Sequence, residues 1–143
     1  MRTLGTILAA VIVSGFVAGM LQVQLGIFFN AQEEFIAVMM GQTILVLVAA
    51  AVLGATFAVT WSSRAISRAA AATIALFIAA LVTLEALALT TSAHATGQLP
   101  SALSKDVPIL VEIGVPGVLA IFIQWWLLRQ YANRRARRAT AAA

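Results

Sequence analysis

The chain has 143 residues and no cysteine, which excludes disulfides, thiolate nucleophiles, iron–sulfur clusters and zinc sites built on cysteine. Its single histidine, His94, cannot supply both axial ligands of a bis-histidine haem. Charged residues make up only 10% of the chain, against about 25% in soluble domains. The sequence also lacks a glycine-rich phosphate loop and a plausible Ser–His–Asp arrangement. We therefore expect no enzyme activity, no cofactor and no resident metal.

Apolar residues, in contrast, dominate the chain at 62%, and the mean hydropathy is +1.01. A bilayer core of about 30 Å requires about 20 consecutive apolar residues in a helix. Four such runs occur, at residues 4–29, 35–61, 69–91 and 107–128. They predict an all-α fold, a polytopic membrane protein whose four transmembrane helices form one antiparallel bundle. Residues 30–34 and 62–68 are expected as short connections, 92–106 as the longest loop, and 129–143 as a basic tail.

Basic residues predict the orientation of this bundle. All eight arginines fall on one side of the membrane if the four runs alternate, and only Lys105 falls on the other. The positive-inside rule then makes both termini cytoplasmic, in what we expect to be a bacterial inner membrane. The residues assigned to the membrane interface and to topology are Trp61, Arg64, Arg68, Trp125, Trp126, Arg129, Arg134, Arg135, Arg137 and Arg138. Contact with anionic lipids is a second role for the tail, and nucleic acid is not an expected partner.

Small residues recur at four-residue spacing within the first two runs. Gly15 and Gly19 form one such pair, and Ala50, Gly54 and Ala58 form a longer stripe. This spacing lets two helix backbones approach closely, so these residues are predicted to pack helices. Gln22 lies late in the first run and is expected near the outer interface.

Two acidic residues lie inside the apolar runs, where a charge costs a few kcal/mol. Glu85 and Glu112 are each about 10 Å below the outer surface at 1.5 Å per residue, and they are expected at one level. Pro116 has no N–H and leaves the carbonyl of Glu112 without its helical partner. The group Glu85, Glu112 and Pro116 is therefore a candidate site for a proton or small cation. Structural pairing is the other interpretation, of Glu112 with Lys105, and of Glu85 with the hydroxyl of Ser92 or with a donor on another subunit.

A metal site is a weaker hypothesis, because no ligand spacing supports it. Its members would be His94, Glu33, Glu34 and Asp106.

These features predict function only at the level of class. The lipid bilayer is the first expected partner. The small-residue stripes favour an accessory or structural subunit of a larger membrane complex, of respiratory, photosynthetic or transport type, with other membrane subunits as further partners. The alternative is a homo-oligomeric ion channel or proton-coupled transporter that uses the embedded carboxylates.

Overall fold

A computed structural model describes residues 2–30, 35–96 and 99–143, leaving out the side chains of 88, 89, 91–107 and 109. Its four helices are α1 (Arg2–Phe29), α2 (Phe35–Thr60), α3 (Ser63–Thr96) and α4 (Leu99–Ala142). The described residues contain no strand, which confirms the all-α prediction. All four helices are long and apolar enough to cross a membrane. The molecule is thus a bundle of four apolar helices, consistent with an integral membrane protein that spans four times.

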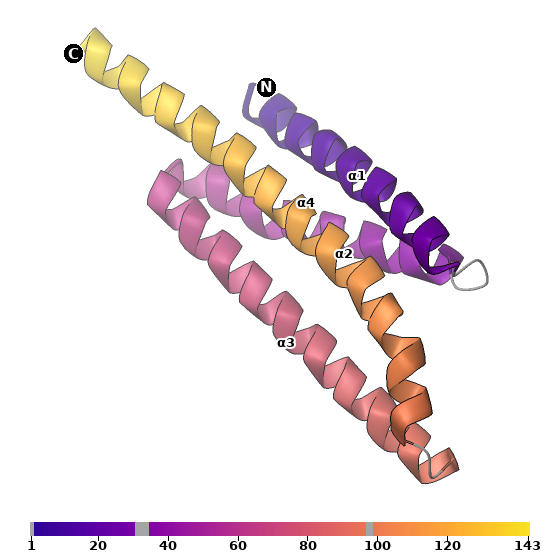
Figure 1. The fold of residues 1–143 in the computed structure, drawn as a ribbon. Coiled ribbons are helices and arrows are strands. Elements are labelled where there is room, and N and C mark those ends of the chain that lie inside the picture. The colour runs from indigo at the N-terminus through magenta and orange to yellow at the C-terminus, as the bar shows by residue number, and fades with distance from the viewer. Residues whose placement is uncertain (1, 31–34, 97–98) are drawn as a thin grey trace.

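Helix α4 holds the bundle together. It lies between α1 and α3 with α2 behind it, and it packs against all three (Figure 1). Helices α1 and α3 do not touch within the described residues. The two ends of the chain lie at the same end of the bundle (Figure 1). A polar group on the inner face of α4 can therefore reach α1 and α2 together.

The helix ends follow from local chemistry. Asn30 stops α1 in a left-handed conformation with φ of 53°, which asparagine tolerates at a helix C-terminus. Trp61 stops α2 with φ of 51°, a conformation that is rare for a bulky residue. Ser62 then begins α3, because its hydroxyl accepts a hydrogen bond from the backbone N of Ala65 at 3.5 Å. Only Trp61 and Ser62 separate α2 from α3.

Two predicted connections were wrong, because they are helical. Residues 63–68 form the first turns of α3, and the expected loop 92–106 is helix except at 97–98, which the structure does not describe. Pro100 favoured a loop in the prediction, but it lies in the first turn of α4. A helix tolerates proline there, because the N–H groups of the first turn have no partner within the helix. Glu33 and Glu34 lie outside the described residues, as do the side chains of His94, Lys105 and Asp106.

Helix α4 is both the longest helix and the one that contains internal prolines. Its 44 residues correspond to about 66 Å at 1.5 Å per residue, twice the thickness of the bilayer core. The segment predicted as a tail, 129–143, continues α4 as far as Ala142. Pro108 and Pro116 lie inside the helix, and its N-terminal part bends away from the rest (Figure 1). Proline is the usual cause of such bends.

The core is apolar and lies along α4. Its largest fully buried apolar side chains are Leu53, Phe57, Ile66 and Leu128. Many leucine, isoleucine and valine side chains point outward, such as Ile12, which is 68% exposed, and Leu76, which is 72% exposed. In a membrane this outer surface contacts lipid tails, which are as apolar as leucine.

Candidate functional site: a polar cluster inside the bundle

Five polar side chains are buried in the bundle among apolar neighbours. They come from α1, α2 and α4, and we call them the polar core: Ser14, Gln22, Gln42, Glu112 and Gln124. Ser14 and Gln22 both belong to the buried stripe of α1, and Glu112 and Gln124 are both buried on α4. Buried polar groups are retained where they are hydrogen-bonded or functional.

Gln124 joins three helices through its side-chain amide. Its Nε2 donates to the hydroxyl of Ser14 on α1 at 3.0 Å and to the carbonyl of Val46 on α2 at 3.2 Å. The hydroxyl of Ser14 donates in turn to the carbonyl of Val11 at 3.1 Å. These bonds fix α1, α2 and α4 at one height.

The turn between Glu112 and Pro116 is the second polar contact between helices. Glu112 is 1% exposed, and Pro116 is fully buried beside it. Pro116 cannot donate to the carbonyl of Glu112, and its ring crowds the backbone there. The side-chain amide of Gln42 takes the orientation in which both its nitrogen and its oxygen find partners. In this orientation its Nε2 donates to the carbonyl of Ile113 at 3.3 Å. Its Oε1 then accepts from the backbone N of Gly117 at 3.1 Å.

The two backbone groups that Gln42 contacts pair with each other in a regular α-helix. The side-chain amide of Gln42 therefore acts on this turn as an additional peptide unit would. It supports α4 beside the proline while leaving the carboxyl of Glu112 inside the bundle. The sequence had predicted a disturbed turn here, but not the glutamine from α2 that binds it.

Glu85 lies at nearly the same height as Glu112. The Cβ position of Gly114 is 3.5 Å from Leu81, and that of Gly117 is 2.7 Å from Phe77. This antiparallel register places Glu85 within about two to three residues, or about 3–4.5 Å, of the height of Glu112. Their surroundings differ, because Glu112 is buried whereas Glu85 on α3 is only half-buried.

A cavity of about 280 Å³ lies between α1 and α2 and reaches the polar core. Its polar lining includes Gln22, Gln42 and Thr43, and glycines 15 and 19 form part of its wall. Gln22 is 1% exposed, and its Nε2 has no hydrogen-bond partner within the part of the chain that the structure describes. Because Gln42 also contacts the Pro116 turn, one side chain connects the cavity with the surroundings of Glu112.

Of the small residues that the sequence predicted to pack helices, some are buried in the bundle and others are exposed. The buried stripe of α1 is Ala10, Ser14, Ala18, Gln22 and Gly26, one residue away from Gly15 and Gly19. No atom outside helix α1 lies within 4 Å of a Cβ placed on Gly19. On α2, Gly54 is buried, and a Cβ placed on it would lie 3.1 Å from Ile7. Ala50 is half-buried and Ala58 is exposed.

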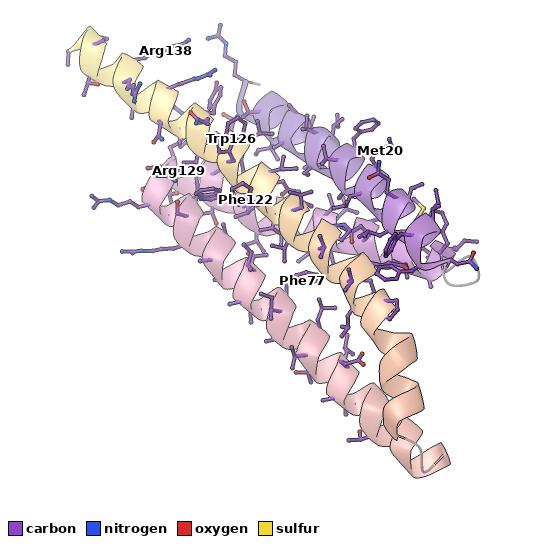
Figure 2. The ribbon with its side chains drawn as sticks, in the orientation of Figure 1. Met20, Phe77, Phe122, Trp126, Arg129 and Arg138 are labelled. Atoms are coloured by element: carbon purple, nitrogen blue, oxygen red, sulfur yellow. The ribbon has the colours of Figure 1, made fainter. Side chains whose placement is uncertain are left out.

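The aromatic residues assigned to the interface make contacts at the end of the bundle where both termini lie. Trp125 donates through Nε1 to the hydroxyl of Ser67 at 2.9 Å, and Arg129 lies 5.1 Å from its ring centroid. Arg135 lies 3.5 Å from the ring centroid of Trp61. Trp126 is 49% exposed, and it points outward on α4 near Arg129 (Figure 2). Other arginines of this end are exposed: Arg64, Arg68, Arg134, Arg137 and Arg138.

Sequence reasoning missed Gln22, Gln42 and Gln124 as interior residues. Gln22 was expected at the interface, but it continues the four-residue stripe that begins at Ala10. Gln124 likewise lies eight residues after Pro116, on the same face of α4. Four-residue spacing from a proline or from a small-residue stripe was the available signal.

No family model, curated protein or solved structure matches this chain. The class of the protein therefore follows from its own residues: an all-α bundle of four helices that can span a membrane, with a polar core.

Proposed function

We propose that this protein is a membrane carrier or channel in which the carboxyl group of Glu112 binds a proton or a small cation. The observation that carries the proposal is the burial of Glu112, at 1% exposure, inside a bundle of apolar helices. An acidic side chain in a membrane helix destabilises insertion and commonly marks an ion or proton pathway. A single chain encloses Glu112, so its burial requires no second subunit.

The neighbouring amides suit this chemistry. A glutamine side chain can donate or accept a hydrogen bond, so Gln22 and Gln42 can solvate a bound cation or a protonated carboxyl. Both residues line the cavity of about 280 Å³, whose other walls are mostly apolar, and Gln42 also reaches the Pro116 turn. Carbonyl groups near a break in a membrane helix can contribute to cation binding in the same way.

The arginine distribution supports a proposal about which side of the membrane the two termini face. The proposed arrangement is an antiparallel bundle with both termini in the cytoplasm of a bacterial cell. It rests on eight arginines at the end of the bundle that holds the termini, and on the positive-inside rule.

Ion flux into vesicles tests the role of Glu112. The purified chain is reconstituted into liposomes that contain a pH-sensitive dye, and flux is driven by a proton or potassium gradient. Glu112→Gln should preserve the folded bundle and abolish flux, because the amide carries neither a charge nor a dissociable proton. Glu85→Gln is the matched control, since it removes a half-buried carboxyl at the same height.

The outcomes separate the proposals. Flux lost in Glu112→Gln and kept in Glu85→Gln identifies Glu112 as the site. Wild-type vesicles without flux for protons, sodium or potassium contradict the proposal, as does full flux in Glu112→Gln.

A second candidate is an accessory subunit of a larger membrane complex. The observation in its favour is an apolar groove of about 610 Å³ along α3 and α4, with Ile78, Gly114 and Phe122 among its walls. Glycine in such a groove allows close approach of another transmembrane helix. This candidate predicts that mild detergent extraction yields a stoichiometric complex with unrelated chains. Purification as copies of itself, with flux, contradicts it.

A further inference from the structure

A second cavity, of about 480 Å³, lies at the end of the bundle that holds both termini. Arg2 and Thr3 reach it from α1, and Trp61 reaches it from the α2–α3 connection. Its remaining wall comes from α4, through Tyr131, Arg134, Arg135 and Arg138. Four arginines, from two helices far apart in sequence, thus line one space. We call it the arginine cavity.

Among the side chains that the structure describes, no carboxylate lies near enough to this end of the chain to neutralise the charge. Its five acidic residues are Glu33, Glu34, Glu85, Asp106 and Glu112. The one that precedes Tyr131 most closely on α4 is Glu112, 19 residues earlier, which corresponds to about 28 Å of helix. Glu85 lies 22 residues beyond the start of α3, or about 33 Å. Because the screening length in physiological salt is only about 8 Å, neither carboxylate offsets the four arginines.

Trp61 forms a fixed wall of the arginine cavity. Its left-handed backbone is a conformation that is unfavourable for a bulky residue and persists only where neighbours hold it. Those neighbours are Phe57, with ring centroids 4.7 Å apart, and Tyr131, at 6.3 Å. Arg135 stacks on the same indole at 3.5 Å. A stacked guanidinium keeps its N–H groups available at its edge, where they suit two oxygens of one anion.

We propose that the arginine cavity binds the phosphate head group of an anionic membrane lipid. Phosphate matches the fork of donors on arginine. A phosphate group also has more oxygens than a carboxylate has, so several arginines around one cavity can bind the same phosphate. The lipid source follows from position. Trp61 and Tyr131 are residue types of the membrane–water interface, and the cavity lies where the apolar spans of α1 and α2 end. Basic pockets at such helix ends bind lipid head groups.

The test measures which lipids remain bound to the purified full-length chain. Protein is placed in nanodiscs of phosphatidylcholine mixed with phosphatidylglycerol, and the retained lipids are counted by native mass spectrometry. Wild type should retain phosphatidylglycerol in preference to phosphatidylcholine. Arg135→Gln and Arg138→Gln should each lower the apparent affinity about fivefold, which corresponds to about 1 kcal/mol for one basic residue at an anionic surface.

Arg137→Gln is the matched control, because Arg137 belongs to the same segment and does not line the cavity. Its retention of phosphatidylglycerol should stay within about twofold of wild type. Equal losses in the Arg137 and Arg138 variants would show a diffuse charge effect and overturn the proposal. Circular dichroism and unfolding in sodium dodecyl sulfate verify that all variants are folded.

A second experiment tests whether the anion that binds in the arginine cavity is a lipid or a soluble phosphate. Thermal unfolding of detergent-solubilised wild type is recorded with short-chain phosphatidylglycerol and, separately, with inorganic phosphate. Stabilisation by the lipid that Arg135→Gln removes supports the proposal. Equal stabilisation by inorganic phosphate at the same concentration assigns the cavity to a soluble anion and overturns the lipid source.

Discussion

Gly117 is the position at which a single added methyl group tests the packing of α3 against α4. The Cβ of an alanine there would lie 2.7 Å from Cζ and 2.8 Å from Cε1 of Phe77. Ordinary van der Waals contact begins at 3.4 Å, so the ring must retreat by about 0.7 Å, the difference between 3.4 and 2.7 Å. Phe77 is only 6% exposed and reaches from α3 toward α4 (Figure 2). The packed surroundings oppose that movement.

The expected cost of Gly117→Ala is set by two opposing terms. Overpacking of a dense core destabilises by about 1–3 kcal/mol. Alanine also has a helix propensity better than that of glycine by about 1 kcal/mol. Gly41→Ala isolates the second term, because nothing lies within 4 Å of a Cβ placed on Gly41. We therefore expect the free energy of unfolding of Gly117→Ala to be about 1–3 kcal/mol lower than that of Gly41→Ala.

The assay is reversible unfolding in mixed micelles, with the folded fraction followed against the mole fraction of sodium dodecyl sulfate. Phe77→Leu removes the atoms that meet the new methyl group. In that background Gly117→Ala should lose its extra cost, which gives a coupling of about 1–3 kcal/mol in a double-mutant cycle. Equal stabilities of the Gly117 and Gly41 variants, without coupling to residue 77, would refute the α3–α4 register and the height assigned to Glu85.

Three further predictions concern hydrogen bonds and orientation. Gln124→Leu should lower the free energy of unfolding by about 1 kcal/mol, since it removes two interhelical bonds of about 0.6 kcal/mol each in a membrane; unchanged stability in the micelle assay would show that these bonds contribute nothing. Ser67→Ala should cost about 0.6 kcal/mol through the bond from Trp125, with Ser63→Ala as a control that leaves this bond intact. A reporter enzyme fused after Ala143 should be active only if it functions in the cytoplasm, and activity outside would reverse the proposed orientation.

The number of helices could be predicted because each apolar run is as long as a membrane requires. The run at residues 35–61, for example, became Phe35–Thr60 almost unchanged. Helix ends were harder, because hydropathy marks where the lipid ends and not where the helix ends. Polar residues such as those after Leu128 continue α4 in water as readily as apolar residues do in lipid.

The site was predictable only in part. Glu112 and Pro116 stand out in the sequence because each conflicts with an apolar helix. Gln42 carries no charge and breaks no helix, so its contact with Ile113 and Gly117 follows only from the packing of α2 on α4. Likewise, Arg2 and Arg135 line one cavity only because the start of α1 packs near the C-terminal part of α4, although these helices are not consecutive.

The central position of α4 has a consequence for biogenesis. Chains emerge from the ribosome N-terminus first, so α1, α2 and α3 enter the membrane before the helix that joins them is made. Until α4 arrives, the amide of Gln42 lacks the turn of Ile113 and Gly117 that it binds in the finished bundle, and Glu112 and Gln124 are not yet present. Helix insertion and helix association are therefore separated in time for this protein. A ribosome that stalls before α4 leaves three helices without the helix against which each of them packs.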